Sequence, residues 1–242
     1  EMEAVIGLSV LAPVLTDQGW RFGDFPGADA DVLNGATHLH EIYSQVDPTY
    51  TGRATVPVLW DKQRRQIVNN ESSDILRMLN SAFDAYGDAG VDLYPSALRT
   101  DIDAINAALY SQLNNGVYQA GFASSQQAYE EAVTGVFAML DDLEERLSDG
   151  RDYLFAGRIT ESDIRLFVTL IRFDAAYYGL FKCNIRRIVD YPNLSAYVGR
   201  IIGLRDLAET VNLDHIKAGY HSIKALNPSG IVPVGPARVY AA

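Results

Sequence analysis

Two stretches determine the predicted fold: Thr55-Val-Pro-Val-Leu-Trp-Asp61 and, after a charged turn, Gln66-Ile-Val-Asn-Asn-Glu-Ser72. Each opens with a short apolar run that is typical of a strand, and residues 61–65 between the runs have a length that suits a hairpin. Pro57 cannot donate a hydrogen bond to a sheet ladder, so we expect it at a sheet edge or in a cis turn. Because a residue before proline is held extended, the backbone of Val56 is left available to pair with a peptide-like ligand.

Glu71 and Ser72 come at the expected start of the next helix. A helix N-terminus has unpaired N–H groups and the positive end of the helix dipole, so a carboxylate binds there readily. The carboxylate of Glu71 can hold a neighbouring ammonium group. The γ-glutamyl end of glutathione carries both charges. Taken singly, Val56-Pro57 is typical of a strand edge and Glu71-Ser72 of a helix cap, but the combination favours a glutathione site.

The first part of the chain is predicted to be an α/β domain. Its expected elements are a strand over residues 4–11, a long loop to about residue 36, a helix over Thr37–Val46, strands over Val56–Trp60 and Gln66–Val68, and a helix from Ser72 to about Tyr86 that buries Ile75, Leu76, Leu79 and Phe83. This order is that of a thioredoxin-like domain without its first strand and helix. The sequence begins at Glu1 without an initiator methionine, and we expect the missing elements before it.

A linker over residues 87–95, rich in glycine and aspartate, separates this domain from an all-helical one. Apolar residues at helical spacing predict helices over Asp101–Leu113, Gln127–Leu147, Ile164–Ile171, Asn193–Leu204 and Asp214–Ile223. The predicted organisation is therefore a domain over residues 1–88, a helical domain over residues 95–226 and an extended tail over residues 227–242.

Composition excludes several classes of function. The 242 residues are 48% hydrophobic with a formal net charge of -11, whereas binding of nucleic acid requires a basic surface. No apolar run is long enough to span a membrane, and no segment resembles a secretory signal, so we expect a cytoplasmic protein. The single cysteine, Cys183, excludes an intramolecular disulfide.

Several blocks along the chain resemble one family closely. They are Asp47-Pro-x-Tyr50-Thr-Gly-Arg53-x-Thr-Val-Pro-Val-Leu-Trp-Asp61, Asn69-Asn-Glu-Ser-Ser73, Asn115-Gly-Val-Tyr118-x-Ala-Gly-Phe122, Arg172-Phe-Asp174, Phe181-Lys-Cys-Asn184 and Asn227-Pro-x-Gly230. As a set they resemble the Xi class of glutathione transferases, the glutathionyl-hydroquinone reductases. The resemblance implies a thioredoxin-like domain followed by the all-helical glutathione-transferase domain, and a homodimer.

The resemblance also implies a reaction. A catalytic cysteine removes glutathione from a glutathionyl-hydroquinone through a cysteine–glutathione mixed disulfide, giving hydroquinone, and a second glutathione then releases oxidised glutathione. In the family this cysteine lies in a Cys-Pro-Trp-Ala type of motif after the first strand. The motif is absent from this sequence, so we expect the nucleophile upstream of Glu1.

The resemblance singles out Tyr118, Tyr177 and Tyr220 as catalytic residues. Phenol hydroxyls are neutral donors that can stabilise charge on a quinol oxygen and deliver a proton as the carbon–sulfur bond breaks. Tyr178 competes with Tyr177 for this role, and His221 stands where a second aromatic residue would be expected. The resemblance also makes Trp20 a wall of the glutathione pocket, beside the contacts expected from Val56, Pro57, Glu71 and Ser72.

Other candidates are set aside on chemical grounds. Cys183 lies in a segment that is predicted to be packed, where a free cysteine behaves as a small hydrophobe and not as an activated thiolate. His38 and His40 are expected to point differently on a helix, and no third ligand supports them, so no metal is predicted. Arg53 is a candidate for binding the anionic ligand, but as a loop arginine it is expected to be solvated. Asp163 is expected to be the acid of a helix cap that begins at Thr160.

Two other functions remain open on the sequence. A conjugating glutathione transferase would activate bound glutathione by a hydroxyl group and form no mixed disulfide. A non-catalytic glutathione-binding or scaffold domain would have no nucleophile at all. A glutathione adduct on an upstream cysteine, detected by mass spectrometry of the full-length protein, would distinguish the reductase from the conjugating transferase. The absence of a cysteine after the first strand would favour the scaffold domain.

Overall fold

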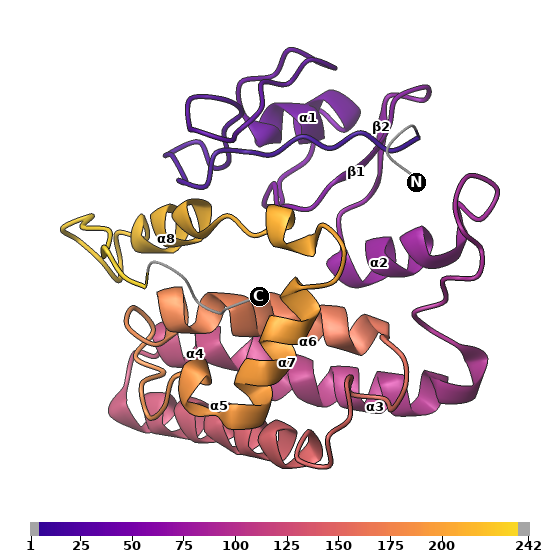
Figure 1. The fold of residues 1–242 in the computed structure, drawn as a ribbon. Coiled ribbons are helices and arrows are strands. Elements are labelled where there is room, and N and C mark those ends of the chain that lie inside the picture. The colour runs from indigo at the N-terminus through magenta and orange to yellow at the C-terminus, as the bar shows by residue number, and fades with distance from the viewer. Residues whose placement is uncertain (1–4, 237–242) are drawn as a thin grey trace. The chain divides into compact units, whose positions relative to one another are not determined.

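A computed structural model describes residues 5–236 of the chain. The backbone divides into two compact units, one up to Asp92 and one from Leu93 onward (Figure 1). Within residues 5–236, no helix has the length and the apolar composition needed to cross a membrane.

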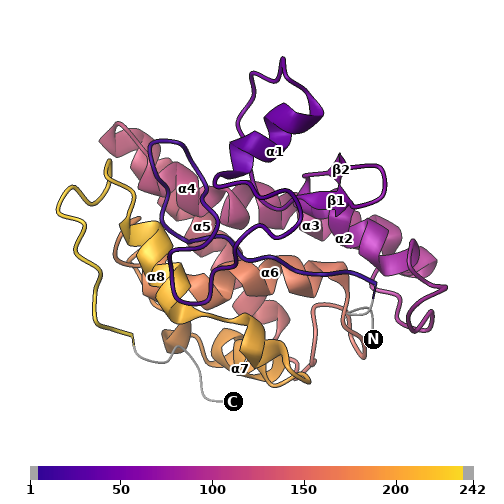
Figure 2. The ribbon, with the colours of Figure 1, turned by 90° about the horizontal axis from the view of Figure 1, so that it is seen from above.

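The first unit is built around a β-hairpin. Its elements are α1 (Leu39–Val46), β1 (Leu59–Asp61), β2 (Gln66–Asn69) and α2 (Ser72–Ser81). The two strands pair antiparallel, and Asp61 caps the turn by accepting hydrogen bonds from the backbone N–H groups of Gln63 and Arg64 at 2.8 and 2.9 Å. The hairpin lies between α1 and α2 (Figure 2). The predicted hairpin is thus confirmed.

A small apolar cluster holds this unit together. Leu39, Ile42 and Tyr43 of α1 are buried. Their neighbours come from the loop before α1 and from the hairpin, and include Leu11, Trp20, Phe22, Val58, Trp60 and Ile67. One face of α1 therefore joins the two chain segments in which glutathione contacts are predicted.

The strand predicted over residues 4–11 is wrong for residues 5–11, and residue 4 lies outside the described residues. Residues 5–11 contain no strand and make no ladder. Single hydrogen bonds hold the segment instead, because the N–H of Val10 donates to the Asp29 carboxylate at 2.7 Å and the N–H of Ala12 donates to the Arg21 carbonyl at 2.9 Å. An apolar run becomes a strand only where a partner strand lies beside it, and here the neighbour is a loop.

The other predicted boundaries in this unit also shift. β1 begins at Leu59 and not at Val56, which agrees with the inability of Pro57 to donate to a ladder. α1 begins at Leu39 because His38 has an extended backbone and serves as the N-cap. The helix predicted to reach Tyr86 ends at Ser81, after which the chain forms turns. The apolar residues predicted to be buried in this helix are only half-buried: Ile75, Leu76, Leu79 and Phe83.

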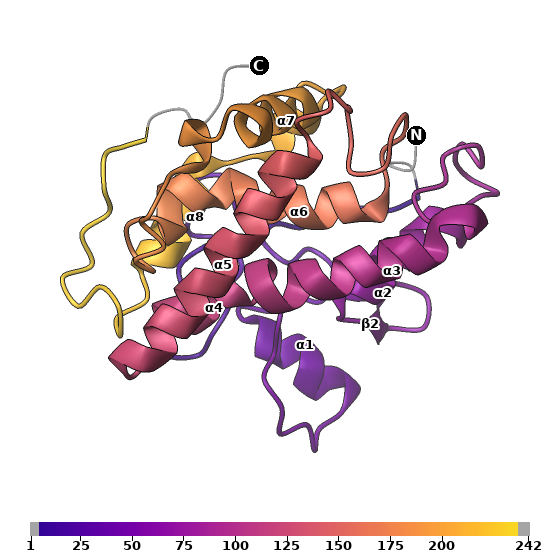
Figure 3. The same cartoon turned by 90° about the horizontal axis from the view of Figure 1, so that it is seen from below.

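The second unit is helical, as predicted. Its α-helices are α3 (Arg99–Ala108), α4 (Gly116–Gly121), α5 (Gln126–Arg146), α6 (Glu161–Arg172), α7 (Pro192–Ile202) and α8 (Leu213–His221). α5 packs against α4 and α7, while α6 packs against α3 and α7 (Figure 3). Residues 227–236 of the predicted tail form no helix or strand, and the remaining tail residues lie outside the described part.

The start of α6 confirms the predicted helix cap. The fully buried Asp163 accepts hydrogen bonds from the N–H and hydroxyl groups of Thr160 at 2.8 and 2.9 Å. It also accepts from the N–H of Leu154 at 2.8 Å and from the Tyr197 hydroxyl at 2.9 Å. One carboxylate therefore joins α6, α7 and the loop before α6.

Candidate active site

The first group of candidate residues lies where the chain enters β1. The Val56–Pro57 peptide bond is cis, and both residues are exposed. Among the described residues, the N–H and C=O groups of Val56 have no hydrogen-bond partner. The backbone of Val56 is therefore free to pair with an extended ligand, as the sequence predicts.

The second group lies at the N-terminus of α2. Glu71 is the N-cap residue, and its own N–H donates to the side-chain oxygen of Asn69 at 2.7 Å. The N–H groups of Ser72 and Ser73, and the hydroxyl of Ser72, have no partner within residues 5–236. The helix dipole and these free donors favour a carboxylate at this position, and the exposed Glu71 carboxylate offers a site for an ammonium group nearby.

Tyr43 links the two groups, and the sequence reasoning missed this role. Its buried ring lies in α1, and its hydroxyl donates to the carbonyl of Thr55 at 2.8 Å. The same hydroxyl accepts from the side-chain amide of Asn70 at 3.0 Å. Thr55 and Asn70 are the residues directly before Val56 and Glu71. The hydroxyl of Tyr43 thereby fixes the spacing between both predicted glutathione contacts.

The contacts of Trp20 and Arg53 do not test the roles predicted for them. Trp20 packs on the apolar cluster of α1, and its carbonyl accepts the N–H of Leu39 at 2.9 Å. Its predicted role as a wall of the pocket stays a prediction. Arg53 is exposed, and the contact that its backbone carbonyl makes is a hydrogen bond of 2.9 Å from the Tyr50 hydroxyl.

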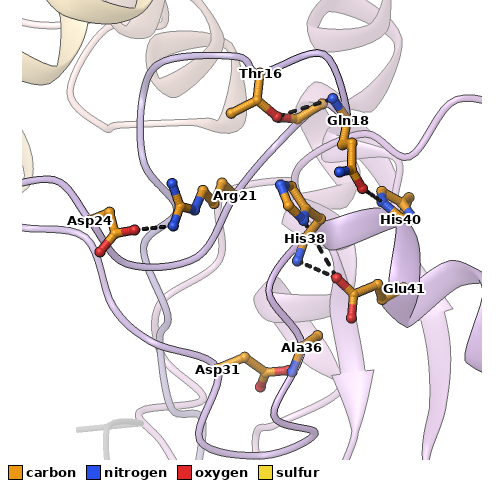
Figure 4. A network of polar contacts seen from close by, with 10 residues as sticks. Thr16, Gln18, Arg21, Asp24, Asp31, Ala36, His38, His40 and Glu41 are labelled. Carbon is orange, nitrogen blue, oxygen red and sulfur yellow. Dashed lines mark hydrogen bonds and ion pairs between the residues drawn. The ribbon is translucent and has the colours of Figure 1, made fainter.

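His38 and His40 lie close together in a polar network around the start of α1 (Figure 4). The expectation that their side chains point differently is wrong, because His38 precedes the helix and its ring stacks on that of His40 at 5.6 Å between centroids. With Glu41 they place three possible ligand atoms within 4.8 Å of one another. However, a ring nitrogen of His40 is already hydrogen-bonded to the side-chain oxygen of Gln18 at 3.2 Å, and the two ring planes are 18° apart. The absence of a metal stays a prediction.

In the second unit, the structure brings together the hydroxyls of the three predicted tyrosines. Tyr118 lies in α4, Tyr177 lies in a π-helical turn after α6, and Tyr220 lies in α8. The Tyr220 hydroxyl is 2.7 Å from the Tyr118 hydroxyl and 2.7 Å from the Tyr177 hydroxyl. Tyr177 is almost fully buried, whereas the side of the network at Tyr118 is 38% exposed. Tyr178 takes no part in this network.

Burial favours the neutral form of Tyr118 and Tyr177. It is the main cause that raises the pKa of Tyr118 and the pKa of Tyr177, and the neighbouring Tyr220 hydroxyl raises both further. The positive charge of Arg172 opposes these effects more weakly. A network of neutral hydroxyls ending at an exposed one can donate a hydrogen bond, and then a proton, to an oxygen that gains negative charge.

One π-helical turn precedes Tyr118, and another contains Tyr177. One spans Leu109–Asn114, just before α4, and the other spans Phe173–Tyr177, just after α6. The side chain of Asn114 donates to the Arg165 carbonyl at 3.0 Å and to the Thr169 hydroxyl at 2.6 Å. Asn114 thus ties the chain before Tyr118 to α6, which leads directly into Tyr177. π-turns are frequent at functional sites, but their side-chain spacing does not distinguish them in a single sequence.

Cys183 has the properties of a structural residue. It is fully buried, and its backbone N–H donates to the Tyr177 carbonyl at 3.1 Å. Burial raises the pKa of its thiol to about 12. An activated nucleophile needs a lowered pKa and access to its substrate. These observations support the prediction that Cys183 is not the nucleophile.

Comparisons with known proteins match segments in both units of the chain. Residues 13–82 match the family model described as glutathione S-transferase, N-terminal domain, and residues 126–200 match glutathione S-transferase, C-terminal domain. Among curated proteins, the chain is similar to the glutathionyl-hydroquinone reductase PcpF of Sphingobium chlorophenolicum. The two are 53% identical over 240 residues, which cover 98% of this chain and 76% of that protein.

Two solved structures show the same similarity in three dimensions. The glutathione-bound structure of YqjG, a glutathione transferase homolog from Escherichia coli K-12, has a TM-score of 0.95 and 49% identity, covering 98% of this chain and 77% of that chain. The glutathione-S-transferase Xi from Phanerochaete chrysosporium has a TM-score of 0.96 and 48% identity, covering 99% and 83% of the two chains.

Proposed function

The chain belongs to the glutathione transferase family, among its Xi-class members, and from this premise we propose that it is a glutathione-dependent reductase of glutathionyl-hydroquinones. The observation that carries the proposal is the network in which the hydroxyls of Tyr118, Tyr177 and Tyr220 meet at 2.7 Å. A conjugating transferase needs a single hydroxyl to activate the thiol of glutathione. A reductase that expels a hydroquinone needs several donors, because a phenolic oxygen gains charge as the ring leaves.

Glutathione is held in this proposal by the first unit. The free backbone of Val56 pairs with the cysteinyl part of the tripeptide, as one strand pairs with another. The γ-glutamyl carboxylate binds the Ser72 hydroxyl and the free N–H groups at the start of α2, and its ammonium group binds the Glu71 carboxylate. Trp20 and Pro57 line the same ligand.

The reaction proceeds in two exchanges at sulfur. In the keto tautomer of the substrate, a hydroquinone proton has moved from one oxygen to the sulfur-bearing carbon. A cysteine thiolate attacks the thioether sulfur of this tautomer, the carbon–sulfur bond breaks, and its electron pair passes through the ring to that oxygen. The oxygen then takes a proton, giving hydroquinone and a cysteine–glutathione disulfide. The thiolate of a second glutathione attacks that disulfide, and oxidised glutathione leaves as the cysteine thiolate is restored. The position of this cysteine upstream of Glu1 stays a prediction.

The tyrosines supply hydrogen bonds and the proton. Because Tyr118 is the most exposed part of the network, its hydroxyl is the proposed donor to the quinol oxygen. Tyr220 stands behind it and Tyr177 behind Tyr220. As charge develops on the quinol oxygen, each hydroxyl can strengthen the donation of the next one.

Ser72→Ala tests the binding part of the proposal. The substitution should weaken glutathione binding by about 1–3 kcal/mol, because a carboxylate contact is lost. Titration calorimetry measures the dissociation constant directly. Ser81→Ala, at the opposite end of α2, is the matched control and should bind as the unmodified protein does. Unchanged affinity in Ser72→Ala would mean that Glu71 and Ser72 serve only as a helix cap.

Mass spectrometry of the full-length protein tests the chemical part. After reaction with a glutathionyl-hydroquinone and no further thiol, we expect one glutathione adduct on a cysteine upstream of Glu1 and none on Cys183. A conjugating transferase would form no adduct but would join glutathione to an electrophile. A scaffold domain would do neither, so the three outcomes separate the candidates.

Two further parts of the proposal concern the molecule in the cell. We infer a cytoplasmic homodimer, and the support is the resemblance to the Xi class together with Cys183, the one cysteine of this sequence, which is free and buried. Light scattering of the purified protein gives its molar mass. A mass equal to one chain would refute the dimer and would leave the chemistry unaffected.

A further inference from the structure

The tyrosines share one neighbour that the proposed reaction does not use. The ring of Phe181 is fully buried. Its centroid lies 5.2 Å from the ring of Tyr118, 5.3 Å from that of Tyr177 and 5.8 Å from that of Tyr220. These separations fall in the range of direct contact between aromatic rings. A single phenylalanine therefore contacts all three rings whose hydroxyls meet.

The position of Phe181 is itself fixed from several sides. The next residue, Lys182, has a φ of 61°, which turns the chain sharply, and its carbonyl accepts the Tyr129 hydroxyl at 2.7 Å. The N–H of Cys183 then donates to the carbonyl of Tyr177 at 3.1 Å. A non-glycine residue in the left-handed region is unfavourable by itself, so the surrounding contacts must hold this turn. The Phe-Lys-Cys block of the sequence thus forms a turn in which Phe181 and Cys183 are buried, and it is joined to one of the tyrosines.

We propose that Phe181 is a positioning residue for the reaction, because its ring sets the spacing of the three tyrosine rings and so keeps their hydroxyls within hydrogen-bond distance. The inference rests on the proposed function of these tyrosines. Phe181 has no polar atom, so the hydroxyls bond to one another and to substrate and not to their common neighbour. Hydrogen bonds weaken steeply with misalignment, and a shift of about 1 Å in a reacting group can cost about 10²-fold in rate.

The kinetic test uses Phe181→Leu in the full-length protein. We expect kcat for a glutathionyl-hydroquinone to fall by about 10- to 100-fold, since the hydroxyls lose their alignment. The affinity for glutathione, measured by calorimetry, should stay within about twofold, because the residues that bind it belong to the first unit. Phe155→Leu is the matched control: Phe155 is also a buried phenylalanine of the helical unit, and its ring faces Arg146. It should keep kcat within about twofold.

A double-mutant cycle separates positioning from a loss of general stability. Tyr220→Phe removes the central hydroxyl, so adding Phe181→Leu to it should cost less than about threefold more in kcat. A full additional loss would overturn the inference. Phe181→Met, which keeps much of the volume without a planar ring, serves if the leucine variant folds poorly, and the same loss of kcat is expected.

The two proposals fail in different ways. If Tyr220→Phe keeps the kcat of the unmodified protein, the tyrosines are not part of the chemistry, and the proposed function loses the observation that supports it. If Tyr220→Phe is impaired while Phe181→Leu or Phe181→Met keeps full kcat, the tyrosines act but Phe181 does not position them.

Discussion

The ring of Phe181 occupies the space that a side chain at Gly121 would need. A Cβ atom added to Gly121 would lie 2.5 Å from Cγ of Phe181 and 2.8 Å from its Cδ1. Carbon atoms that are not bonded do not approach so closely, so glycine is required here for packing. The last turn of α4 therefore lies directly against the ring that contacts the three tyrosines.

Gly121→Ala should accordingly destabilise the protein. Overpacking of a filled core costs about 1–3 kcal/mol in the free energy of unfolding, because the ring or the helix must move. Urea denaturation measures the change. Gly135→Ala in α5 is the control, since nothing lies within 4 Å of a Cβ added there. That variant should instead gain about 0.5–1 kcal/mol from higher helix propensity, and equal effects in both variants would refute the steric explanation.

Asp163→Ala should be among the most damaging substitutions in the helical unit. It leaves the N–H groups of Thr160 and Leu154 and the Tyr197 hydroxyl without their acceptor in a fully buried place. Each unsatisfied donor costs about 1–3 kcal/mol, so the loss for these three donors is at least about 3 kcal/mol. Thermal unfolding followed by circular dichroism measures it. The exposed Asp190, paired with Arg187, provides the control, and its alanine variant should unfold near the temperature of the unmodified protein.

The sequence predicted those features of the fold that depend on neighbouring residues. The cap formed by Thr160 and Asp163 could be identified because a cap residue and an acid three positions later form one local hydrogen-bonded unit. The hairpin followed from two apolar runs and a short polar connection. The strand expected at residues 4–11 failed because a strand also requires a partner, and the composition of a segment does not reveal whether one lies beside it.

The site depends on contacts between distant residues, which explains what the sequence missed. Tyr118 and Tyr220 are 102 positions apart, and no periodicity brings their hydroxyls together. Only the resemblance to a family singled them out. Tyr43 and Phe181 were missed as organising residues because each is a buried aromatic residue whose partners lie on other elements. The orientations of His38 and His40 were predicted wrongly because the helix begins at Leu39, two residues later than expected, so that His38 lies before it.

The histidine pair gives a prediction about metal. If the near-parallel rings of His38 and His40 bind no ion, treatment with EDTA should leave glutathione affinity and the melting temperature unchanged. Elemental analysis by mass spectrometry should find no stoichiometric zinc, nickel or copper in the purified protein. His40→Ala provides the control, because it removes one of the three possible ligands. A bound metal that is lost in His40→Ala would contradict the prediction.

Cys183 should remain unreactive in the folded protein. With its thiol buried and its pKa raised to about 12, iodoacetamide at pH 8 should leave it unmodified until denaturant is added, as peptide mass spectrometry can show. The raised pKa also has a consequence for stability. The unfolded chain ionises this thiol at its ordinary pKa, whereas the folded chain does not. The contribution of the buried, neutral thiol to the free energy of unfolding is therefore complete below that ordinary pKa. It is lost as the pH rises toward about 12.

Cys183→Ala removes this dependence of stability on pH. At neutral pH the variant should lose about 1 kcal/mol, because the packing of the sulfur atom is lost. In alkaline solution its stability should fall less steeply than that of the unmodified protein. Urea denaturation at several pH values gives both quantities. The variant should also keep its kcat toward glutathionyl-hydroquinones in the full-length protein, since its sulfur takes no part in the exchange. A variant that folds but loses the glutathione adduct would instead make Cys183 the nucleophile.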